Sequence, residues 1–393
     1  MKKLLQQSHR LPSIILVITL FACSGKTGQQ KNNNNSQSPL SSEISKKEQT
    51  YPEYARLFSV EYDGHTKIVR IKNPFDTASH LKTYLLVPRG AQADDDLPPG
   101  ETIRIPVRSV GLPHTTHIGF FNELGLLNTI NGVSQKKYIK NQTIRQAVES
   151  GKVGEFGPSH NINVEKLLQV KPELLFVAPF KDNRYQKVRD VGIPIAVNSS
   201  YMETTPLARA EWIKFISYFF NREQEARQIF DSIAHTYNKL KAMTRPLSET
   251  PTIFSGKKIG QTWYVPGGKS YMADFFQDAG AHYLWKGNQE SGSLPLDFET
   301  VYMKAKEADY WCILENFPGD YTYEKLGSEN IHYSRFDAFS NRRVIFCNTH
   351  NKPYYEEGIL EPHMILADLI SIIHPGILPG HDNKYYELLS KRQ

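Results

Sequence analysis

Residues 221–244, NREQEARQIFDSIAHTYNKLKAMT, decide the fold expected for this chain, because apolar side chains recur there at helical spacing. The pattern predicts one amphipathic helix of about 22 residues with a rise of roughly 33 Å. Asn221 with Gln224 resembles a capping box, and Arg245 before Pro246 closes the far end. The apolar stripe consists of Ala226, Ile229, Phe230, Ile233, Tyr237 and Leu240, and the charged face carries Glu225, Arg227, Asp231 and Lys239.

A helix of this length has two interpretations. It can cross between two lobes, or it can be an ordinary core helix inside one domain. The sequence on either side favours the first interpretation, because each flank repeats its own pattern of short apolar strands and helices.

Composition narrows the class of protein. The 393 residues are 39% hydrophobic and 22% charged, which is globular and sufficient for two cores. The formal net charge of +6 includes Lys2, Lys3 and Arg10, so the rest of the chain is only weakly basic. This balance argues against a nucleic-acid partner.

The first residues have the pattern of a secretion signal. Residues 1–22 combine a basic start with an apolar run that is too short for a permanent membrane helix. Cys23 follows Leu20-Phe21-Ala22, which resembles a bacterial lipobox, so we expect Cys23 to carry lipid such as palmitate. A free or disulfide-bonded Cys23 is the alternative.

Residues 23–50 are polar and repetitive, and we expect them to form a flexible, lipidated tether at a membrane surface. Beyond the tether, cysteine occurs only at Cys312 and Cys347, each inside an apolar run. Secretion would permit a disulfide between them, whereas buried cysteines are as often inert core residues. Both possibilities stay open from the sequence.

Residues 51–204 are expected to form an N-terminal lobe. It opens with an extra β-hairpin between Tyr54 and Pro88 and continues with an apolar strand from Ile105 to Val110. Short apolar strands then alternate with helices, which is typical of a doubly wound parallel sheet.

Residues 205–244 are expected to hold a helical segment and the interlobe helix, and residues 245–393 a second lobe that ends in a helix. The predicted fold class is therefore α/β, with two doubly wound parallel-sheet lobes joined by one long rigid helix. A ligand cleft is expected between the lobes, because ligands bind beyond the carboxyl ends of parallel strands and at lobe interfaces.

Several phrases between residues 105 and 390 are typical of one family. They are VGLPHTTHIGFFNELGLLNTINGV, NVEKLLQVKPELLFV, TTPLARAEWIKFISYFF, WYVPGGKSYMADFFQDAGAHYLW, SLPLDFETVYMKAKEADYW and PHMILADLISIIHPGILPGH. These phrases resemble the substrate-binding lipoproteins of ABC importers for iron complexes and cobalamin, which are helical-backbone, class III proteins, in the form common in Bacteroidetes. The resemblance implies a periplasmic monomer with a ligand between its lobes, modest closure, and an ABC permease with its ATPase as partner.

The loops that follow the expected strands are predicted to line the cleft. On the first lobe the candidates are His114, Thr115, Thr116, Ser159, Phe180 and Glu203. On the second lobe they are Trp263, Tyr264, Gly268, Lys269, Ser270, Tyr271, Trp285, Asn316, Tyr354 and Tyr355.

Each candidate has a plainer explanation. The Gly268-Lys269-Ser270 turn before a helix can receive an anion, or it is only a turn. The large rings suit a flat ligand, or they pack between sheet and helix. His114 and His117 lie three residues apart without a third metal ligand, so no protein metal site is predicted. A Tyr or His that reaches the iron of a bound haem stays open.

In the resembled family, an exposed glutamate on each lobe docks onto arginines of the permease, and the matching positions are Glu165 and Glu299. The alternative is that both are helix-start glutamates at the positive end of the helix dipole.

The sequence thus predicts a membrane-anchored receptor that binds an iron complex, a ferric siderophore or haem, and performs no chemistry. Cobalamin is the nearest alternative ligand; a chelatase-like enzyme or a stand-alone sequestering lipoprotein is less favoured. No nucleophile stands with a base at recognisable spacing, and no Walker lysine loop or cysteine cluster occurs. No resident cofactor is expected.

Overall fold

The computed structural model describes residues 48–76, 78–93, 96–182 and 184–390. The predictions for the signal peptide, for lipidation of Cys23 and for most of the tether lie outside these described residues. The described residues belong to one compact unit. No helix in the described part is both long enough and apolar enough to cross a membrane.

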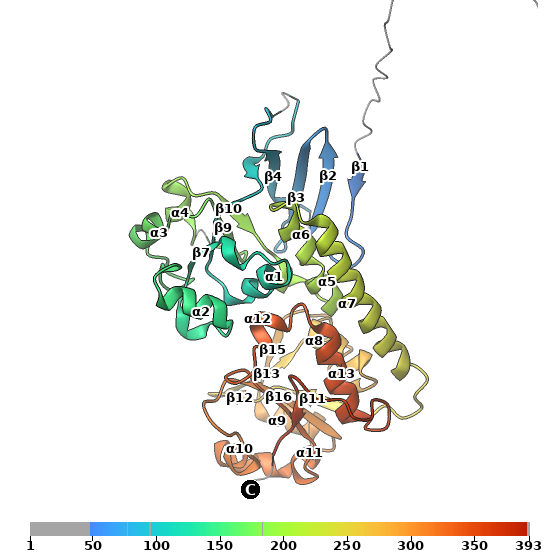
Figure 1. The fold of residues 1–393 in the computed structure, drawn as a ribbon. Coiled ribbons are helices and arrows are strands. Elements are labelled where there is room, and N and C mark those ends of the chain that lie inside the picture. The colour runs from blue at the N-terminus through green and yellow to red at the C-terminus, as the bar shows by residue number, and fades with distance from the viewer. Residues whose placement is uncertain (1–47, 77, 94–95, 183, 391–393) are drawn as a thin grey trace, which may run out of the picture. The chain divides into compact units, whose positions relative to one another are not determined.

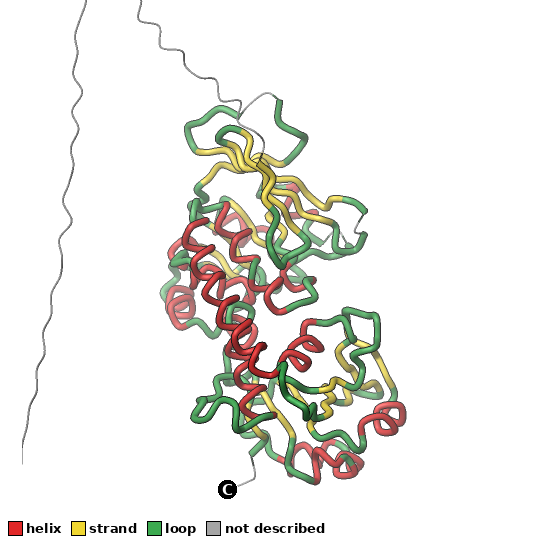
Figure 2. The backbone as a smooth tube through the Cα atoms, turned by 90° about the vertical axis from the view of Figure 1, so that its right-hand side faces the viewer, coloured by secondary structure: helices red, strands yellow, loops and turns green. Residues whose placement is uncertain are grey.

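The N-terminal hairpin is confirmed, and it belongs to a larger five-stranded sheet. Strands β1 to β4 are antiparallel neighbours, and β5 runs parallel to β4. The sheet lies at the end of the molecule opposite the C-terminus (Figure 2). The strands are β1 (Glu48–Thr50), β2 (Phe58–Asp63), β3 (Thr66–Lys72), β4 (His80–Pro88) and β5 (Glu101–Ile105).

The strand expected from Ile105 to Val110 is wrong. Ile105 ends β5 of the N-terminal sheet, whereas Val110 begins β6 of the next sheet. Pro106 lies between them and has no N–H to offer a strand ladder, which accounts for the break.

The N-terminal lobe has the predicted parallel sheet, in the order β10-β9-β6-β7-β8. Its strands are β6 (Val110–Leu112), β7 (Ile130–Val133), β8 (Gly154–Glu155), β9 (Leu174–Val177) and β10 (Ile195–Val197). Its helices are η1 (Thr115–His117), α1 (Ile118–Glu123), η2 (Leu127–Thr129), η3 (Lys136–Tyr138), α2 (Gln142–Glu149), α3 (Val164–Val170) and α4 (Gln186–Asp190).

The helical segment contains the predicted long helix. It comprises η4 (Ser200–Met202), α5 (Pro206–Ala210), α6 (Trp212–Tyr218) and α7 (Glu223–Thr244), of which α7 has 22 residues. Helix α7 packs on α6 at one end and on α13 (Pro362–Ile373) at the other, so it crosses from one lobe to the other (Figure 1).

The buried face of α7 includes Ala226, Phe230, Ile233 and Tyr237 of the predicted stripe, whereas Ile229 and Leu240 are only half-buried. The predicted capping box is wrong, because Arg222 occupies the cap position without a side-chain hydrogen bond. Asn221 instead has φ 55° and accepts a hydrogen bond from Lys67 Nζ at 2.8 Å.

The C-terminal lobe contains a mostly parallel sheet in the order β14-β11-β16-β17-β18, with β18 antiparallel, and a separate antiparallel sheet β12-β13-β15. The strands are β11 (Thr252–Ser255), β12 (Lys258–Ile259), β13 (Thr262–Pro266), β14 (His282–Tyr283), β15 (Ser293–Leu296), β16 (Tyr310–Glu315), β17 (Val344–Asn348) and β18 (Glu387–Leu388). The lobe therefore continues past α13, the helix expected to end it.

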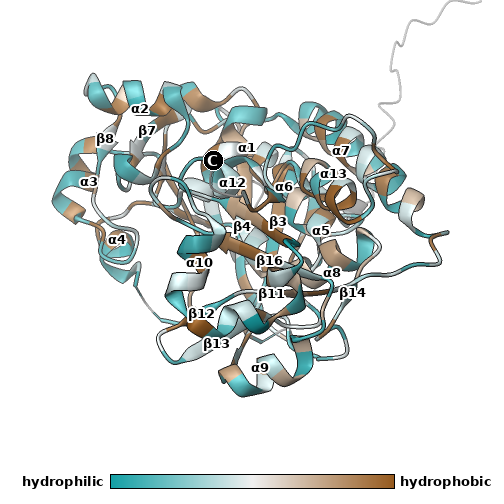
Figure 3. Cartoon of the chain, turned by 90° about the horizontal axis from the view of Figure 1, so that it is seen from below, coloured by the Kyte–Doolittle hydropathy of each residue, from teal (hydrophilic) through white to brown (hydrophobic). Residues whose placement is uncertain are grey.

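The remaining helices of this lobe are α8 (Tyr271–Asp278), α9 (Phe298–Ala305), α10 (Tyr323–Glu329), η5 (Ile331–Arg335), α11 (Asp337–Ser340) and α12 (Tyr354–Glu357). Hydrophobic residues concentrate in the central strands, whereas the surrounding helices are mixed (Figure 3). Cys312 and Cys347 are both buried and free, so they are core residues and form no disulfide.

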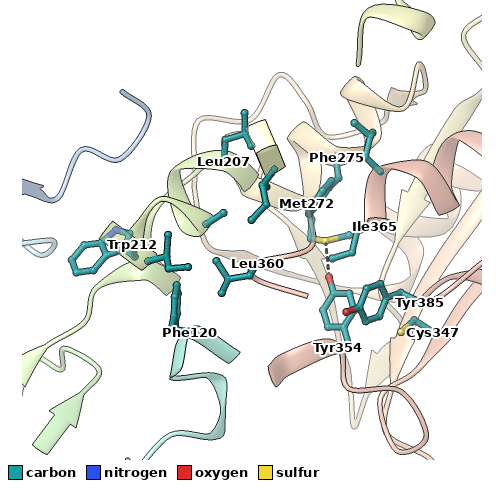
Figure 4. Packing of buried hydrophobic residues seen from close by; sticks show 14 of the residues in the cluster. Phe120, Leu207, Trp212, Met272, Phe275, Cys347, Tyr354, Leu360, Ile365 and Tyr385 are labelled. Carbon is teal, nitrogen blue, oxygen red and sulfur yellow. Dashed lines mark hydrogen bonds between the residues drawn. The ribbon is translucent and has the colours of Figure 1, made fainter. Parts of the chain in front are cut away.

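The two lobes share a continuous apolar junction in addition to α7. Helix α12 of the C-terminal lobe packs on η1 and α1 of the N-terminal lobe. Figure 4 shows Leu360 between Phe120 of α1 and Met272 of α8, and all three belong to one buried cluster. The two lobes therefore contact each other directly, in addition to being connected by α7.

Candidate ligand-binding site

A cavity of about 300 Å³ opens at the junction of the lobes, between η1, α5, α8, α12 and α13. Apolar side chains make up much of its wall, and they come from both sides of the junction. Those apolar residues are Ala178, Phe180, Pro206, Phe275, Ile359, Pro362 and Ile365. A cavity of this size and lining is typical of a small-molecule site.

Several residues predicted from the sequence meet here. His114, Thr116 and Phe180 line the cavity from the N-terminal lobe, and Tyr271, Tyr354 and Tyr355 line it from the C-terminal lobe. Thr115 and Asn316 line an adjoining cavity of about 480 Å³, which shares Thr116 and Tyr355 with the first. The structure therefore brings these candidates together around one divided space.

Other candidates lie elsewhere. Trp263 is fully buried among Phe254, Trp311 and Tyr333, and Trp285 is buried beside Tyr283 with Lys304 over its ring. Tyr264 is exposed on β13. Trp263 and Tyr264 belong to the antiparallel sheet β12-β13-β15, whereas the rule that places ligands beyond strand ends applies to parallel sheets. Trp285 follows β14 of the mostly parallel sheet, but its ring is packed in the core.

The turn before α8 also lies apart from the cavity. Ser270 is buried and caps α8 by accepting the Ala273 N–H at 3.2 Å. Gly268 is crowded by the carbonyl oxygens of Trp285, Lys286 and Asn288, so a side chain would not fit there. Lys269 is exposed, and Ser159 is half-buried in the loop after β8.

Glu203 does not line the cleft, and its expected place there is wrong. Its buried carboxylate accepts hydrogen bonds from the N–H groups of Arg56 and Leu57, at 2.9 and 3.0 Å, and from Trp212 Nε1 at 3.1 Å. Glu203 therefore fastens the N-terminal segment to the helical segment.

Arg209 lines the cavity and was not singled out from the sequence. It lies on α5, in PLARA, where a lone charge among apolar residues was the signal that could have marked it. Its guanidinium carbon lies 3.8 Å from the centroid of the Tyr271 ring. Its Nε is buried and has no hydrogen-bond partner among the described residues.

His114 and His117 lie on the N-terminal side of the cavity, with ring centroids 5.5 Å apart. Burial, with a further contribution from Arg184, lowers the pKa of His114 to about 4. Burial, with a further contribution from His114, lowers the pKa of His117 to about 3. Both imidazoles are therefore neutral at pH 7.

The hydrogen bonds of these histidines differ. His114 Nε2 lies 3.1 Å from the Tyr185 hydroxyl. His117 bonds to the backbone of Phe176, whereas its buried Nδ1 has no partner among the described residues. A neutral imidazole with one nitrogen held by backbone and the other free can accept a hydrogen bond or meet a metal.

Tyr354 and Tyr355 begin α12 and bring two phenol groups to the cavity. The Tyr354 hydroxyl faces Met272 Sδ at 3.7 Å (Figure 4). Burial raises the pKa of Tyr355 to about 12 and that of Tyr354 well above its ordinary value. Both phenols stay protonated at neutral pH.

The adjoining cavity is basic. Lys137, Lys140, Lys352 and His350 line it, together with the buried Glu356. Lys352 pairs with Glu387 at 3.4 Å, and Lys140 Nζ donates to the His350 carbonyl. Lys137 lies over the Tyr138 ring, 4.8 Å from its centroid. Positive charge therefore exceeds negative charge around this space.

Among the described residues, no group of three or more His, Cys, Asp or Glu side chains could hold a metal ion.

Glu165 and Glu299 occupy equivalent positions on the two lobes. Each stands two residues after a helix cap, Asn163 for α3 and Asp297 for α9, whose side chain accepts a backbone N–H. Both glutamates are exposed, and neither has an ion-pair partner within the described residues.

These features define a binding protein of two α/β lobes, joined by a rigid helix, with its cavity at the junction. The chain belongs to the periplasmic binding protein family, whose sequence pattern matches residues 114–350. The architecture is the class III fold of this group, as the resemblance implied.

Three known proteins illustrate the likeness. An uncharacterized lipoprotein of Methanocaldococcus jannaschii is 26% identical over 398 residues, which covers 96% of this chain and 98% of the relative. A periplasmic heme binding protein from Pseudomonas aeruginosa has a TM-score of 0.57 at 16% identity, covering 73% of this chain and 99% of its own. The periplasmic vitamin B12 binding protein of Vibrio cholerae has a TM-score of 0.51 at 13% identity, covering 68% and 97%.

Proposed function

We propose that this protein is the substrate-binding component of an ABC importer, which captures an iron complex, haem or a ferric siderophore, and delivers it to a membrane permease. The observation that carries the proposal is the aromatic cavity at the lobe junction, where His117 Nδ1 and Arg209 Nε have no hydrogen-bond partner among the residues that the structure describes. Buried polar atoms without partners cost free energy, and a bound ligand supplies the missing partner.

The proposed mechanism is capture and release without a chemical step. The ligand enters between the lobes, and tyrosine, phenylalanine and neutral histidine rings enclose it. Because α7 crosses between the lobes and α12 contacts the far side, only a small rocking motion is expected.

Delivery is proposed to use Glu165 and Glu299. An exposed ion pair contributes only about 0 to 1 kcal/mol, so these carboxylates set the register of each lobe on its permease subunit more than they add affinity. The lipid at Cys23 and the tether 23–50 would keep the receptor near a permease in the same membrane.

Cobalamin is the second candidate ligand. It is favoured by the likeness to the vitamin B12 binding protein of Vibrio cholerae and by the adjoining cavity, which offers room for a larger molecule.

A thermal-shift series with ferric haem, ferric siderophores and cyanocobalamin tests the proposal, together with absorption spectra of protein purified from its native membrane. We expect a concentration-dependent rise in melting temperature with a member of this series and a matching spectrum in the purified protein. No shift with any of them would refute capture of a metal complex.

A further inference from the structure

Arg209 is a positive charge with no compensating group in the cavity that it lines. Among the described lining residues it alone carries a formal charge at neutral pH, because both histidines are neutral and no carboxylate lines the space. Its buried Nε lacks a partner, and its guanidinium is fixed on one face by the Tyr271 ring. The Arg209 guanidinium is therefore held in a fixed orientation, but its charge and its Nε–H lack a partner among the described residues.

A second arginine nearby, Arg184, has a guanidinium whose hydrogen bonds are made within the protein. Arg184 lies over Phe180, 3.3 Å from the ring centroid, and Phe180 also lines the cavity. Its Nε and a terminal nitrogen donate to Asp182, at 2.8 and 2.9 Å. Both guanidinium groups stack on an aromatic ring, and of the two only Arg184 has a carboxylate partner in the described part of the chain.

His117 is an independent indication that the cavity binds a ligand with a polar group. The residue is only 2% exposed, it lines the same cavity, and its Nδ1 has no hydrogen-bond partner within the described ranges of the chain. The adjoining space adds Lys137, Lys140 and Lys352 against the single lining carboxylate of Glu356, which backbone N–H groups of residues 140 and 141 already satisfy. Both parts of the divided space therefore favour an anion.

We propose that the ligand belongs to the class of carboxylate-bearing metal complexes and that Arg209 binds one of its carboxylates while the rings of the cavity hold its apolar body. This inference rests on the proposed function and makes it more specific. Guanidinium and carboxylate match as a two-pronged pair, and stacking on Tyr271 orients the fork in advance. An electroneutral corrinoid without carboxylates would not supply this pair.

The test compares ferric haem, which carries carboxylates, with its dimethyl ester, which does not, by fluorescence quenching or calorimetry on the full chain. We expect the unaltered protein to bind haem roughly 10- to 100-fold more tightly than the ester, the range for one charged hydrogen-bonded pair. Arg209→Gln should bind haem more weakly by this 10- to 100-fold factor, and its affinity for the ester should equal that of the unaltered protein. Arg184→Gln, the matched control, removes a guanidinium that is already paired with Asp182, so it should keep the haem-to-ester affinity ratio of the unaltered protein.

Arg209→Lys keeps the positive charge but not the two-pronged geometry of the guanidinium. Its affinity for haem should therefore lie between that of the unaltered protein and that of Arg209→Gln. If Arg209→Gln fails to fold, the haem and ester comparison on the unaltered protein still decides. Equal binding of haem and ester, with no effect of Arg209→Gln, would overturn the carboxylate assignment and leave capture of a metal complex standing. Tight cyanocobalamin binding without haem binding would also overturn it. No binding of any probe would remove the proposed function, and this inference with it.

Discussion

Glu356 of α12 accepts a hydrogen bond from the backbone N–H of Asn141 at 2.8 Å, and its other carboxylate oxygen accepts the N–H of Lys140. The carboxylate is buried and belongs to the C-terminal lobe, whereas both donors belong to the N-terminal lobe. This contact joins the lobes beside the cavity, at a distance from α7. Tyr354 and Tyr355, two residues and one residue before it, line the cavity.

Glu356→Gln should weaken both the fold and ligand binding. The amide keeps one acceptor and turns a donor toward the other N–H, so we expect unfolding free energy to fall by about 1–3 kcal/mol. Affinity should fall as well, because α12 carries two cavity tyrosines. Urea unfolding and ligand titration measure the two effects. The neighbouring Glu357→Gln, which breaks only a surface pair with Lys384, is the control, and an equal loss there would count against the contact.

Gly119→Ala should push α12 away from α1. A Cβ at residue 119 would meet the Glu356 carbonyl oxygen at 1.9 Å, which the backbone can relieve only by moving. We expect a lower melting temperature and weaker ligand binding, by calorimetry and titration. Gly287→Ala is the matched control, since a Cβ there meets nothing within 4 Å. If both variants behave alike, close packing at this point is not what positions α12.

Stability should rise with pH between about 4.5 and 6 because of the two cavity histidines. Their folded pKa values, about 4 and about 3, lie below the unfolded value of 6.5, so the unfolded chain binds more protons in this range. Their contribution is complete above pH 6.5 and is lost as pH falls. His114→Gln should reduce the slope of unfolding free energy by roughly 1.4 kcal/mol per pH unit. Urea unfolding at several pH values measures it, and an unchanged slope would show that His114 titrates normally.

Charge reversal at Glu165 and Glu299 should abolish ligand-dependent stimulation of the permease ATPase while ligand affinity stays unchanged. Both carboxylates are exposed at helix starts, away from the cavity. Reconstituted ATPase measurements with the double Lys variant test this. Glu249→Lys, on the exposed segment after α7, serves as the control for a general charge effect. Full stimulation by the double variant would reject the docking role.

Ligand binding should change the dimensions of the protein only slightly. The lobes meet through α7, through α12 and through the apolar cluster around Leu360, so a wide hinge motion would break several contacts at once. Small-angle scattering with and without ligand measures the radius of gyration. A large compaction on binding would contradict this expectation.

Regular elements were the part of the fold most accessible from sequence. The strands β7, β9 and β10 and the helices α2, α3 and α7 lie where apolar periodicity placed them, because periodicity reflects a local choice between helix and strand. The antiparallel sheet β12-β13-β15 was not foreseen, since strand pairing depends on partners distant in the chain. That error put Trp263 and Tyr264 among the cleft candidates, and neither lines the cavity.

The residues of the candidate site also fall into those that the sequence indicated and those that it did not. His114, Thr116 and Phe180, which were predicted from loops after parallel strands, line the same cavity, because strand ends of a parallel sheet share one edge. Arg209 lies inside a helix, and nothing in its neighbours along the chain shows whether a carboxylate will face it. Only the tertiary structure shows that the Tyr271 ring of the C-terminal lobe stacks on the Arg209 guanidinium.

The sequence by itself determined the α/β class, the long helix and the family pattern, since these depend on residue order over short stretches. Tertiary structure decided which side chains share the cavity and which polar atoms there remain without partners. The Glu356 contact joins residues 215 positions apart, and the energy of such contacts is set by distance and burial in space, which local sequence does not encode.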